Sequence, residues 1–251
     1  GCSQGGQDTV VHMEQSGYVR LERGPAVLLA DAGPVGPDYL PGHAHADTLC
    51  FELSLQGQRV CVNSGTSTYE PGSLRKFQRS TRAHNTTAVD GAESSEVWGA
   101  FRVARRARTV VETLRSGGDE DVLIAVHDGY CRLPGRPVHR RNWRLDSGRL
   151  RVDDEISGKG THLVEIFLHF HPKITAEAEG GGIALSDRKI GIFLARIRWD
   201  EGMEVLLEDG FWYPEFGKSE ANKCCVFRFE AVELPVKAGF EIEWTPGGAE
   251  A

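Results

Sequence analysis

Apolar and polar residues alternate along several short stretches of this chain, and this period of two limits the possible folds more than any other feature. Residues 49–55 carry leucine or phenylalanine at every second position. The same alternation returns in residues 164–170 and, more briefly, in residues 227–229 and 240–242. Such a pattern places one face of an extended strand on a core and the other towards solvent or a second layer. The alternation therefore predicts β-strands.

Glycine-containing clusters mark turns between the predicted strands, because glycine tolerates the backbone angles of tight turns. They lie at residues 116–119, 147–148, 157–160 and 180–182. Only the stretch after Gly72, through Leu74 and Phe77, favours a short helix. Many short strands at regular spacing predict an all-β sandwich or barrel. We interpret the three glycines at 180–182 as a hairpin turn, with a boundary between two halves as the alternative.

The composition excludes several classes of protein. The chain has 251 residues, of which 40% are apolar, and a formal net charge of −7. This length and apolar content allow a substantial core in one large or two small domains. The mild acidity argues against a nucleic-acid binder. No apolar run approaches the roughly 20 residues that a membrane-spanning helix needs, so we expect neither nucleic acid nor a membrane span.

The motif GHAHAD at residues 42–47 carries the clearest chemical signal. On an extended chain, His43 and His45 point to the same side. Imidazole is the commonest protein ligand for zinc-like metals, so such a pair supplies two ligands at once. Asn63 and His84 follow at spacings compatible with neighbouring strands that converge. Surface histidines produce the same short motif, which has little specificity by itself.

A cupin-type metal barrel also begins with H-x-H on a strand. There a glutamate follows the second histidine after three or four residues, whereas Glu52 follows His45 after six intervening residues. The second cupin signature fits from Gly65 to Pro71, but the interval to His84 is too long. A cupin-like metalloenzyme therefore remains an alternative.

Taken in order, a set of short motifs is more specific than any one of them. The motifs are GHAHADTL at 42–49, VNSGT at 62–66, YEPG at 69–72, RSTRAHNT at 79–86, VDG at 89–91, WGAFRV at 98–103, HDGY at 127–130 and YPEFG at 213–217. Together they resemble the C-terminal β-sandwich half of heparinase II/III-type polysaccharide lyases. The resemblance runs from about residue 18 to about residue 244.

The resemblance implies a fold and an activity. Residues 1–17 would form an N-terminal leader, and residues 18–251 a large multi-stranded antiparallel β-sandwich, supersandwich-like, with little helix. A catalytic α/α toroid half would lie upstream in the parent protein, and acidic polysaccharide would bind between the halves. The reaction is β-elimination at a uronic acid, which requires removal of the weakly acidic C5 proton. The tyrosine base comes from the toroid, so this chain alone is expected to be inactive. A periplasmic, cell-envelope or secreted location is also implied.

The same resemblance assigns roles to individual residues. His43 would be the catalytic histidine, and a structural metal would be held by His45, Asn63 and His84. The metal would be zinc, with calcium as the alternative. Family members usually carry aspartate at the position of Asn63, and an amide oxygen is a weaker zinc ligand than a carboxylate. Loss of the metal is therefore an open outcome, although Asp47 offers a carboxylate in compensation.

Several further residues are candidates for substrate binding. We expect Tyr69, Arg79 and Arg82 to contact the sugar, although a turn tyrosine more often serves packing. Basic stretches at 102–108 and 139–144 suit carboxylates and sulfates. Solvated arginines on strands explain these stretches equally well. The rival hypothesis is a non-catalytic module that binds acidic glycan through its arginines.

Overall fold

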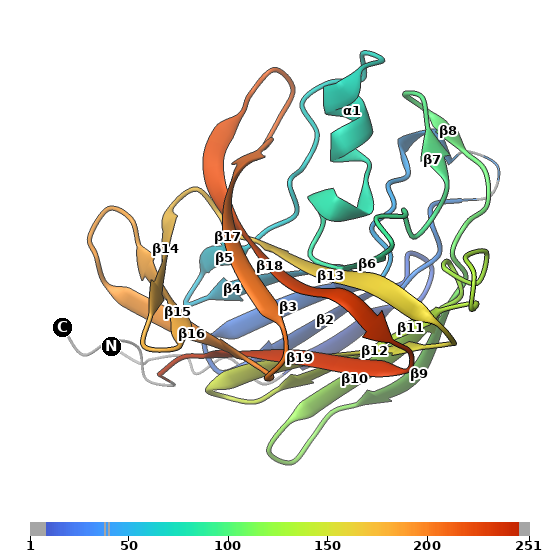
Figure 1. Ribbon diagram of the computed structural model, residues 1–251. Helices are drawn as coiled ribbons and strands as arrows, with labels where there is room; N and C mark the ends of the chain where they lie inside the picture. Colours follow the sequence, from blue (N-terminus) through green and yellow to red (C-terminus); the bar gives the residue numbers. More distant parts are fainter. Residues whose placement is uncertain (1–8, 38, 40, 246–251) are drawn as a thin grey trace.

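A computed structural model describes residues 9–37, 39 and 41–245 of the chain (Figure 1). Antiparallel sheets make up nearly all of its regular structure. The prediction of a large antiparallel β-sandwich with little helix is confirmed. In the described residues, no helix has the length and apolar content needed to cross a membrane.

Three large sheets and one small ribbon form the fold. The five-stranded sheet has the order β1 (Thr9–Met13), β2 (Tyr18–Arg23), β3 (Ala26–Asp31), β4 (Phe51–Leu55), β5 (Gln58–Cys61). The eight-stranded sheet has the order β14 (Ile174–Glu179), β15 (Gly182–Asp187), β16 (Phe193–Trp199), β19 (Val236–Glu243), β12 (Arg149–Ser157), β11 (Val138–Leu145), β10 (Asp121–His127), β9 (Thr109–Arg115). The four-stranded sheet has the order β17 (Glu204–Trp212), β18 (Glu220–Glu233), β13 (Thr161–His169), β6 (Thr87–Val89). The ribbon pairs β7 (Val97–Trp98) with β8 (Arg102–Val103).

The helical segments are short. They are η1 (Pro41–His43), α1 (Ser73–Gln78) and η2 (Thr81–Ala83). Helix α1 coincides with the stretch after Gly72 for which a helix was predicted. In Figure 1, α1 and the β7–β8 ribbon lie together on one side of the stacked sheets.

Most of the predicted strands are present with the expected faces. Strand β4 buries Phe51, Leu53 and Leu55 and leaves the residues between them half-buried. It pairs with β5 across Gly57. The glycines at 180–182 lie at the turn between β14 and β15, which form a hairpin. The alternative of a boundary at these glycines is therefore wrong.

The core lies between the eight-stranded sheet and the other two large sheets. Phe51 on β4, Phe227 on β18 and Phe240 on β19 bring one residue from each sheet to the same place. The rings of Phe227 and Phe240 stack with centroids 5.0 Å apart, and those of Phe51 and Phe240 lie 6.4 Å apart. Burial of such rings drives the sheets together, because each removes a large apolar area from water.

Strand β13 departs from simple alternation. Residues 164–170 are all buried, including Phe167 on the face that the sequence pattern left polar. Phe167 packs with Ala88 and Val226, and the guanidinium of Arg82 lies 5.2 Å from its ring centroid. Both faces of this strand are covered, because Ile166 and Leu168 pack in the main core while Phe167 packs in a separate cluster on the opposite face.

The predicted leader spans residues 1–17, of which residues 1–8 lie outside the described residues. Thr9–Met13 form β1, which pairs antiparallel with β2. The first sheet therefore begins nine residues before Tyr18, where the domain boundary was predicted. The apolar stretch in β1 is short, and only the first two residues of the strand are half-buried.

One buried ion pair anchors the long connections to the eight-stranded sheet. Arg141 on β11 donates to both carboxylate oxygens of Asp154 on β12, at 2.6 and 2.8 Å. Its remaining donors reach the carbonyl oxygens of Leu49 and Asn85, at 2.9 and 2.7 Å. Leu49 lies in the connection from β3 to β4, and Asn85 lies in the connection from β5 to β6. One guanidinium thus fixes two segments that are far apart in sequence.

Candidate functional site

His43 and His45 line one cavity of about 650 Å³. The prediction that they lie on an extended strand is wrong, because η1 ends at His43 and residues 44–47 form a connection outside any strand. Strands β3 and β4 pair antiparallel, so the chain from residue 32 to residue 50 must reverse direction. Proline and glycine at positions 41 and 42 favour a turn at that point.

The cupin-like alternative is also wrong. The histidines lie in connections at the side of a β-sandwich, whereas a cupin site requires them on barrel strands. The other residues that line the cavity are Gln15, Ser16, Tyr18, Asp31, Pro34, Val35, Gly36, Pro37, Ala44, Asp47 and Thr66.

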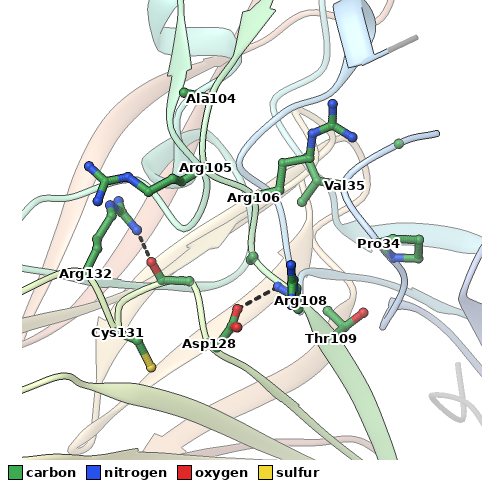
Figure 2. A pocket seen from close by; sticks show the side chains of 13 residues that line it. Pro34, Val35, Ala104, Arg105, Arg106, Arg108, Thr109, Asp128, Cys131 and Arg132 are labelled. Atoms are coloured by element: carbon green, nitrogen blue, oxygen red, sulfur yellow. Dashed lines mark hydrogen bonds between the residues drawn. The ribbon is translucent and has the colours of Figure 1, made fainter. Parts of the chain in front are cut away.

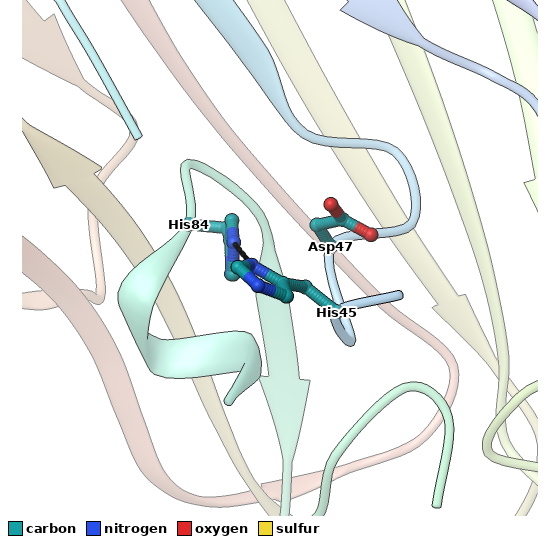
Figure 3. Close-up of side chains that lie close together, drawn as sticks. All are labelled: His45, Asp47 and His84. Atoms are coloured by element: carbon teal, nitrogen blue, oxygen red, sulfur yellow. Dashed lines mark hydrogen bonds between the residues drawn. The ribbon is translucent and has the colours of Figure 1, made fainter. Parts of the chain in front are cut away.

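Three potential metal ligands gather beside this cavity (Figure 3). The Nδ1 atom of His45 lies 3.1 Å from the Nε2 atom of His84. A carboxylate oxygen of Asp47 and one ring nitrogen from each of the two histidines all lie within 4.8 Å of one another. The structure therefore brings together His45 and His84, as predicted, and adds Asp47.

Hydrogen bonds orient both imidazoles. His84 Nδ1 lies 2.8 Å from the carbonyl oxygen of Ser80, which only accepts, so Nδ1 carries the proton and Nε2 keeps its lone pair. A histidine whose second nitrogen donates to a carbonyl is a typical metal ligand. His45 Nε2 lies 3.3 Å from a guanidinium nitrogen of Arg75 and 3.4 Å from the hydroxyl of Thr66. Arg75 only donates, so His45 Nε2 accepts and its Nδ1 proton points to His84.

His45 stays neutral over the physiological pH range. Burial, followed by the charges of the neighbouring His84, Arg75, Arg79 and His43, lowers its pKa to about 2. The neutral imidazole is the form that binds metals. Binding of a metal through Nδ1 of His45 would still require that nitrogen to release the proton that it directs to His84.

The side chain of Asn63 is engaged with the protein. Its Oδ1 accepts from the backbone N–H of Asn85 at 3.0 Å, and its Nδ2 donates to the sulfur of Cys50 at 3.4 Å. Cys50 belongs to a second cluster with Asp31 and Asp47, whose ligand atoms also lie within 4.8 Å of one another. Burial, followed by the charge of Asp47, raises the pKa of both Asp31 and Cys50. Asp47 thus joins the two clusters, and a metal role for Asn63 stays a prediction.

His43 contacts an exposed group of aromatic rings. Its ring lies edge-on to Tyr69, with centroids 5.0 Å apart, and to Phe101, at 5.9 Å. Tyr69 also contacts Phe216 at 4.6 Å, and the guanidinium of Arg75 lies 5.0 Å from its ring centroid. Tyr69, Phe101 and Phe216 are all exposed. Tyr69 is therefore placed where a ligand of His43 would meet it, and substrate contact by this residue stays a prediction.

The two arginines predicted to bind substrate have different surroundings. Arg79 is buried, and its guanidinium donates to the carbonyl oxygens of Ala44 at 3.0 Å, Gly99 at 3.0 Å and Arg102 at 3.1 Å. Because Ala44 lies between the two histidines, this geometry favours positioning of the site over contact with a sugar. Arg82 forms an ion pair with Glu208 at 2.6 Å. Neither arginine lines the cavity.

Sequence reasoning missed Arg75, the residue that faces His45. It is 1% exposed and also donates to the carbonyl oxygen of Ala100 at 3.2 Å. The predicted helix contained it, but nothing in the pattern indicated that this position is buried against the histidine. Gly65 in the VNSGT motif has a φ of 81°, and a Cβ there would meet the carbonyl oxygen of Tyr213 at 2.2 Å. The motif at 213–217 therefore packs on the one at 62–66.

Solved structures of heparinases share this fold. A heparinase III is 19% identical over 98% of this chain and 38% of that chain, with a TM-score of 0.75. The heparan sulfate lyase of Pedobacter heparinus is 17% identical over 93% of this chain and 36% of that chain, with a TM-score of 0.73. Another heparinase III is 15% identical over 97% of this chain and 38% of that chain, with a TM-score of 0.78. The chain spans little more than a third of each of these enzymes.

The family comparison covers nearly the whole chain. No curated protein matches it. The model of the family described as heparinase II/III-like, C-terminal, matches residues 6–245. This match includes the histidine motif, the cavity and all three large sheets. The chain therefore belongs to the family of heparinase II/III-like C-terminal domains.

Proposed function

We propose that this chain is the β-sandwich part of a polysaccharide lyase that cleaves uronic-acid-containing acidic polysaccharide by β-elimination. The observation that carries the proposal is that His43 and the cluster of His45, Asp47 and His84 adjoin the same cavity. Family membership and the likeness to heparinases support it. Because the chain spans about a third of those enzymes, an α/α toroid half is the proposed partner, and it supplies the base.

The reaction sets a clear demand on His43. A base removes the proton at C5 of the uronate, the bond between C4 and the glycosidic oxygen breaks, and that oxygen takes up a proton. Negative charge develops on the uronate carboxylate as the C5 proton leaves, so a donor must meet it. The imidazole of His43, held edge-on by Tyr69 and Phe101, supplies an N–H to that carboxylate or to the reacting ring.

The donor set beside His43 fits zinc. Two nitrogens bound to one tetrahedral zinc at about 2.0–2.1 Å lie about 3.3 Å apart, and the two imidazole nitrogens here lie 3.1 Å apart. Calcium prefers an all-oxygen shell. We propose His45, His84 and Asp47 as the ligands, with Asp47 providing the carboxylate that position 63 lacks. A zinc held by these residues would link the connection before β4 to the connection after η2. It would also supply positive charge there.

The test uses the complete lyase that carries this domain and a panel of uronate polymers. We expect His43→Ala to lower kcat by about 10²–10⁴-fold, the usual contribution of a positioned proton donor or acceptor. The readout is the ultraviolet absorbance of the unsaturated uronate. His12→Ala, an exposed histidine on β1, is the matched control. An unchanged kcat in the His43 variant, on a polymer that the unaltered enzyme cleaves, would refute the proposal.

A non-catalytic binding module is the second candidate. One observation favours it: the molecule has another cavity, lined by arginines, in the described part of the chain. A complete protein that binds acidic glycan but releases no unsaturated uronate from any polymer of the panel would support this candidate.

A further inference from the structure

The turn between β15 and β16 exposes a group of apolar side chains. Residues 188–193, with the sequence RKIGIF, are all exposed, and we call them the RKIGIF turn. The exposed fraction is 64% for Ile190, 41% for Ile192 and 44% for Phe193. In the described part of the chain, Tyr39 is the one large apolar residue that is more exposed than Ile190. Apolar side chains that gather in one exposed place mark a contact surface, whereas isolated ones need no explanation.

Hydrogen bonds hold this turn in one conformation. One oxygen of the Asp187 side chain accepts from the N–H groups of Lys189, at 2.8 Å, and Ile190, at 3.0 Å. The other oxygen accepts from the side-chain amide of Gln58 on β5 at 3.0 Å. The apolar side chains are therefore presented by a fixed backbone, so their contact with a partner costs little conformational entropy.

Basic side chains border the apolar ones. Arg188 and Lys189 belong to the turn, and Lys173 adjoins it, because its carbonyl oxygen accepts from the N–H of Arg188 at 2.7 Å. No ion pair of the described residues involves any of these three side chains. The guanidinium of Arg188 donates to the carbonyl oxygen of Ile174 at 3.3 Å, which does not neutralise its charge. With Asp187 beside them, three cations and one carboxylate leave a formal charge of +2 here, although the chain carries −7.

The turn lies away from the cavities of the molecule. In Figure 1, β15 and β16 lie on the left, and the β7–β8 ribbon lies on the right. A cavity of about 870 Å³ adjoins the one that contains His43, and residues 104–109 line part of it (Figure 2). The described residues that line these two cavities do not include the RKIGIF turn. A partner that covers either cavity does not thereby cover the turn.

We propose that the RKIGIF turn docks this chain on the surface of an anionic lipid bilayer. The three apolar side chains enter the boundary between headgroups and acyl chains, which removes them from water. The three basic side chains stay among the anionic headgroups, where each gains electrostatic attraction. This contact is peripheral, and it is independent of the proposed function because no residue of the histidine cluster takes part in it.

The size and the charge of the surface favour a lipid over a protein partner. A stable protein–protein interface takes about 800 Å² and about 20–30 residues from each partner, many more than this turn supplies. A bilayer surface is fluid and adapts to a single hairpin turn. Basic residues around apolar ones also match anionic headgroups above acyl chains. The affinity should fall as salt is added, because part of it is electrostatic.

The first test measures sedimentation of this chain with two kinds of vesicle. One is made of phosphatidylcholine alone, and the other contains phosphatidylglycerol as well. We expect the chain to partition into the anionic vesicles about tenfold or more in excess, because each basic residue near such a surface contributes about fivefold. Absence of binding, or equal binding to both vesicles, would overturn the proposal. The complete protein that carries this domain should bind as well, and failure to do so would mean that another part of it covers the turn and that the proposal is wrong.

A double variant tests the apolar contact. Ile190→Ser/Phe193→Ser should weaken partitioning by about tenfold or more, since it removes most of the apolar area that leaves water. Val110→Ser/Phe211→Ser is the matched control on β9 and β17, where the two residues are 58% and 52% exposed. All four positions are exposed, so folding should be retained. Equal losses in the two double variants would overturn the proposal.

A single variant tests the charge. Lys189→Ser should weaken partitioning into the anionic vesicles by about fivefold and leave the weak binding to phosphatidylcholine unchanged. Lys237→Ser removes the same charge from an exposed position on β19, and should change partitioning by less than about twofold because salt screens distant charges. The same loss in both variants would mean that net charge alone controls binding, and the assignment to this turn would be wrong.

A tryptophan in the turn distinguishes insertion from adsorption. Vesicles with brominated acyl chains should quench the fluorescence of Ile190→Trp more than that of the unaltered chain, and Val110→Trp should show no such excess. Binding without this excess quenching would refute insertion and with it the proposal. If the chain instead forms a dimer in solution that Ile190→Ser/Phe193→Ser dissociates, and binds no vesicle, the turn contacts a second copy and the proposal is wrong.

Discussion

Two pairs of histidines in this molecule lie within hydrogen-bond distance of each other, and they differ in what surrounds them. His45 and His84 are 3.1 Å apart beside a cavity and near the carboxylate of Asp47. His127 and His139 are 3.0 Å apart between β10 and β11, and both are buried. The contact within each pair is nearly the same. The difference lies in the carboxylate that each pair meets.

The carboxylate of the second pair is already neutralised. His127 Nδ1 accepts from the N–H of Gly129 at 3.1 Å, so its Nε2 proton points to His139. His139 in turn donates to Asp154 at 2.6 Å, and Asp154 pairs with Arg141. Every nitrogen of this pair has a protein partner. By contrast, Asp47 has no cationic partner among the ion pairs of the described residues. A histidine pair is a candidate metal site only where a carboxylate is left free to join it.

The largest expected effect comes from the second pair. Burial alone would raise the pKa of Asp154, but Arg141 and His139 hold it below its ordinary value. Asp154→Asn leaves Arg141 as a buried, uncompensated charge and should lower the free energy of unfolding by about 3–5 kcal/mol. Urea denaturation measures the change. Glu155→Gln, at a half-exposed position next in sequence, should cost less than about 1 kcal/mol. If Asp154→Asn lowers the free energy of unfolding by less than about 1 kcal/mol, the buried network around His127 and His139 does not differ in this way from the cluster of His45 and His84.

The next effect comes from the first pair. His84→Ala should abolish metal binding, as measured by elemental analysis of protein purified without a nickel column or chelator. With free zinc at about 100 times its dissociation constant, the unaltered chain should gain about 2.7 kcal/mol of stability, and the variant none. His127→Gln is the control, since it alters the structural pair alone and should keep the metal. Equal metal content in His84→Ala and the unaltered chain would contradict the assignment.

The pH dependence of stability gives a smaller and graded effect. Burial, followed by the charges of His139 and Arg141, lowers the pKa of His127 well below its ordinary value of about 6.5. Below that pH the unfolded chain binds a proton that the folded chain refuses, so the stability falls as the pH falls. One such group contributes a slope of about 1.4 kcal/mol per pH unit between its folded and unfolded pKa values. His127→Gln should reduce the slope of the free energy of unfolding against pH, measured by urea denaturation between pH 6.5 and 5. The reduction should correspond to about one bound proton.

His162 provides the control of opposite sign. Burial would lower its pKa, but its contact with Asp90 at 2.7 Å raises it above the ordinary value. Its stabilising contribution is therefore complete below the unfolded pKa and is lost as the pH rises through the folded pKa. Asp90→Asn should remove that contribution at pH 6 and have little effect at pH 8, because the φ of 54° at this position suits asparagine as well as aspartate. An identical pH profile in both variants would refute the assignment of the two titrations.

The sequence predicted the strands better than their partners. Alternation identified β4, β18 and β19, because burial of one face leaves a period of two in the residues. It did not predict that β19 pairs with both β12 and β16, since those contacts join segments almost 90 residues and about 40 residues apart. The two-sided burial of β13 also escaped the pattern, because it depends on neighbours from distant parts of the chain.

For the site, motifs identified residues and could not provide geometry. His43, His45 and His84 were found because they stand in recognisable motifs. The extended backbone assumed for the first two was wrong, and the proximity of Asp47 to His84 depends on how two connections fold over each other. Arg75 had no motif at all. Its importance comes from burial beside His45, which a single sequence does not show.

The guanidinium of Arg141 has a consequence for the motions of the site. Leu49 and Asn85 belong to irregular connections, which in most proteins open locally at little free-energy cost. Here their carbonyl oxygens are bound to a side chain of the central strands, and residues 84–87 are buried. Opening these connections requires rupture of both hydrogen bonds to the buried guanidinium. The backbone amides of residues 84–87 should therefore exchange hydrogen for deuterium almost as slowly as those of β11 itself.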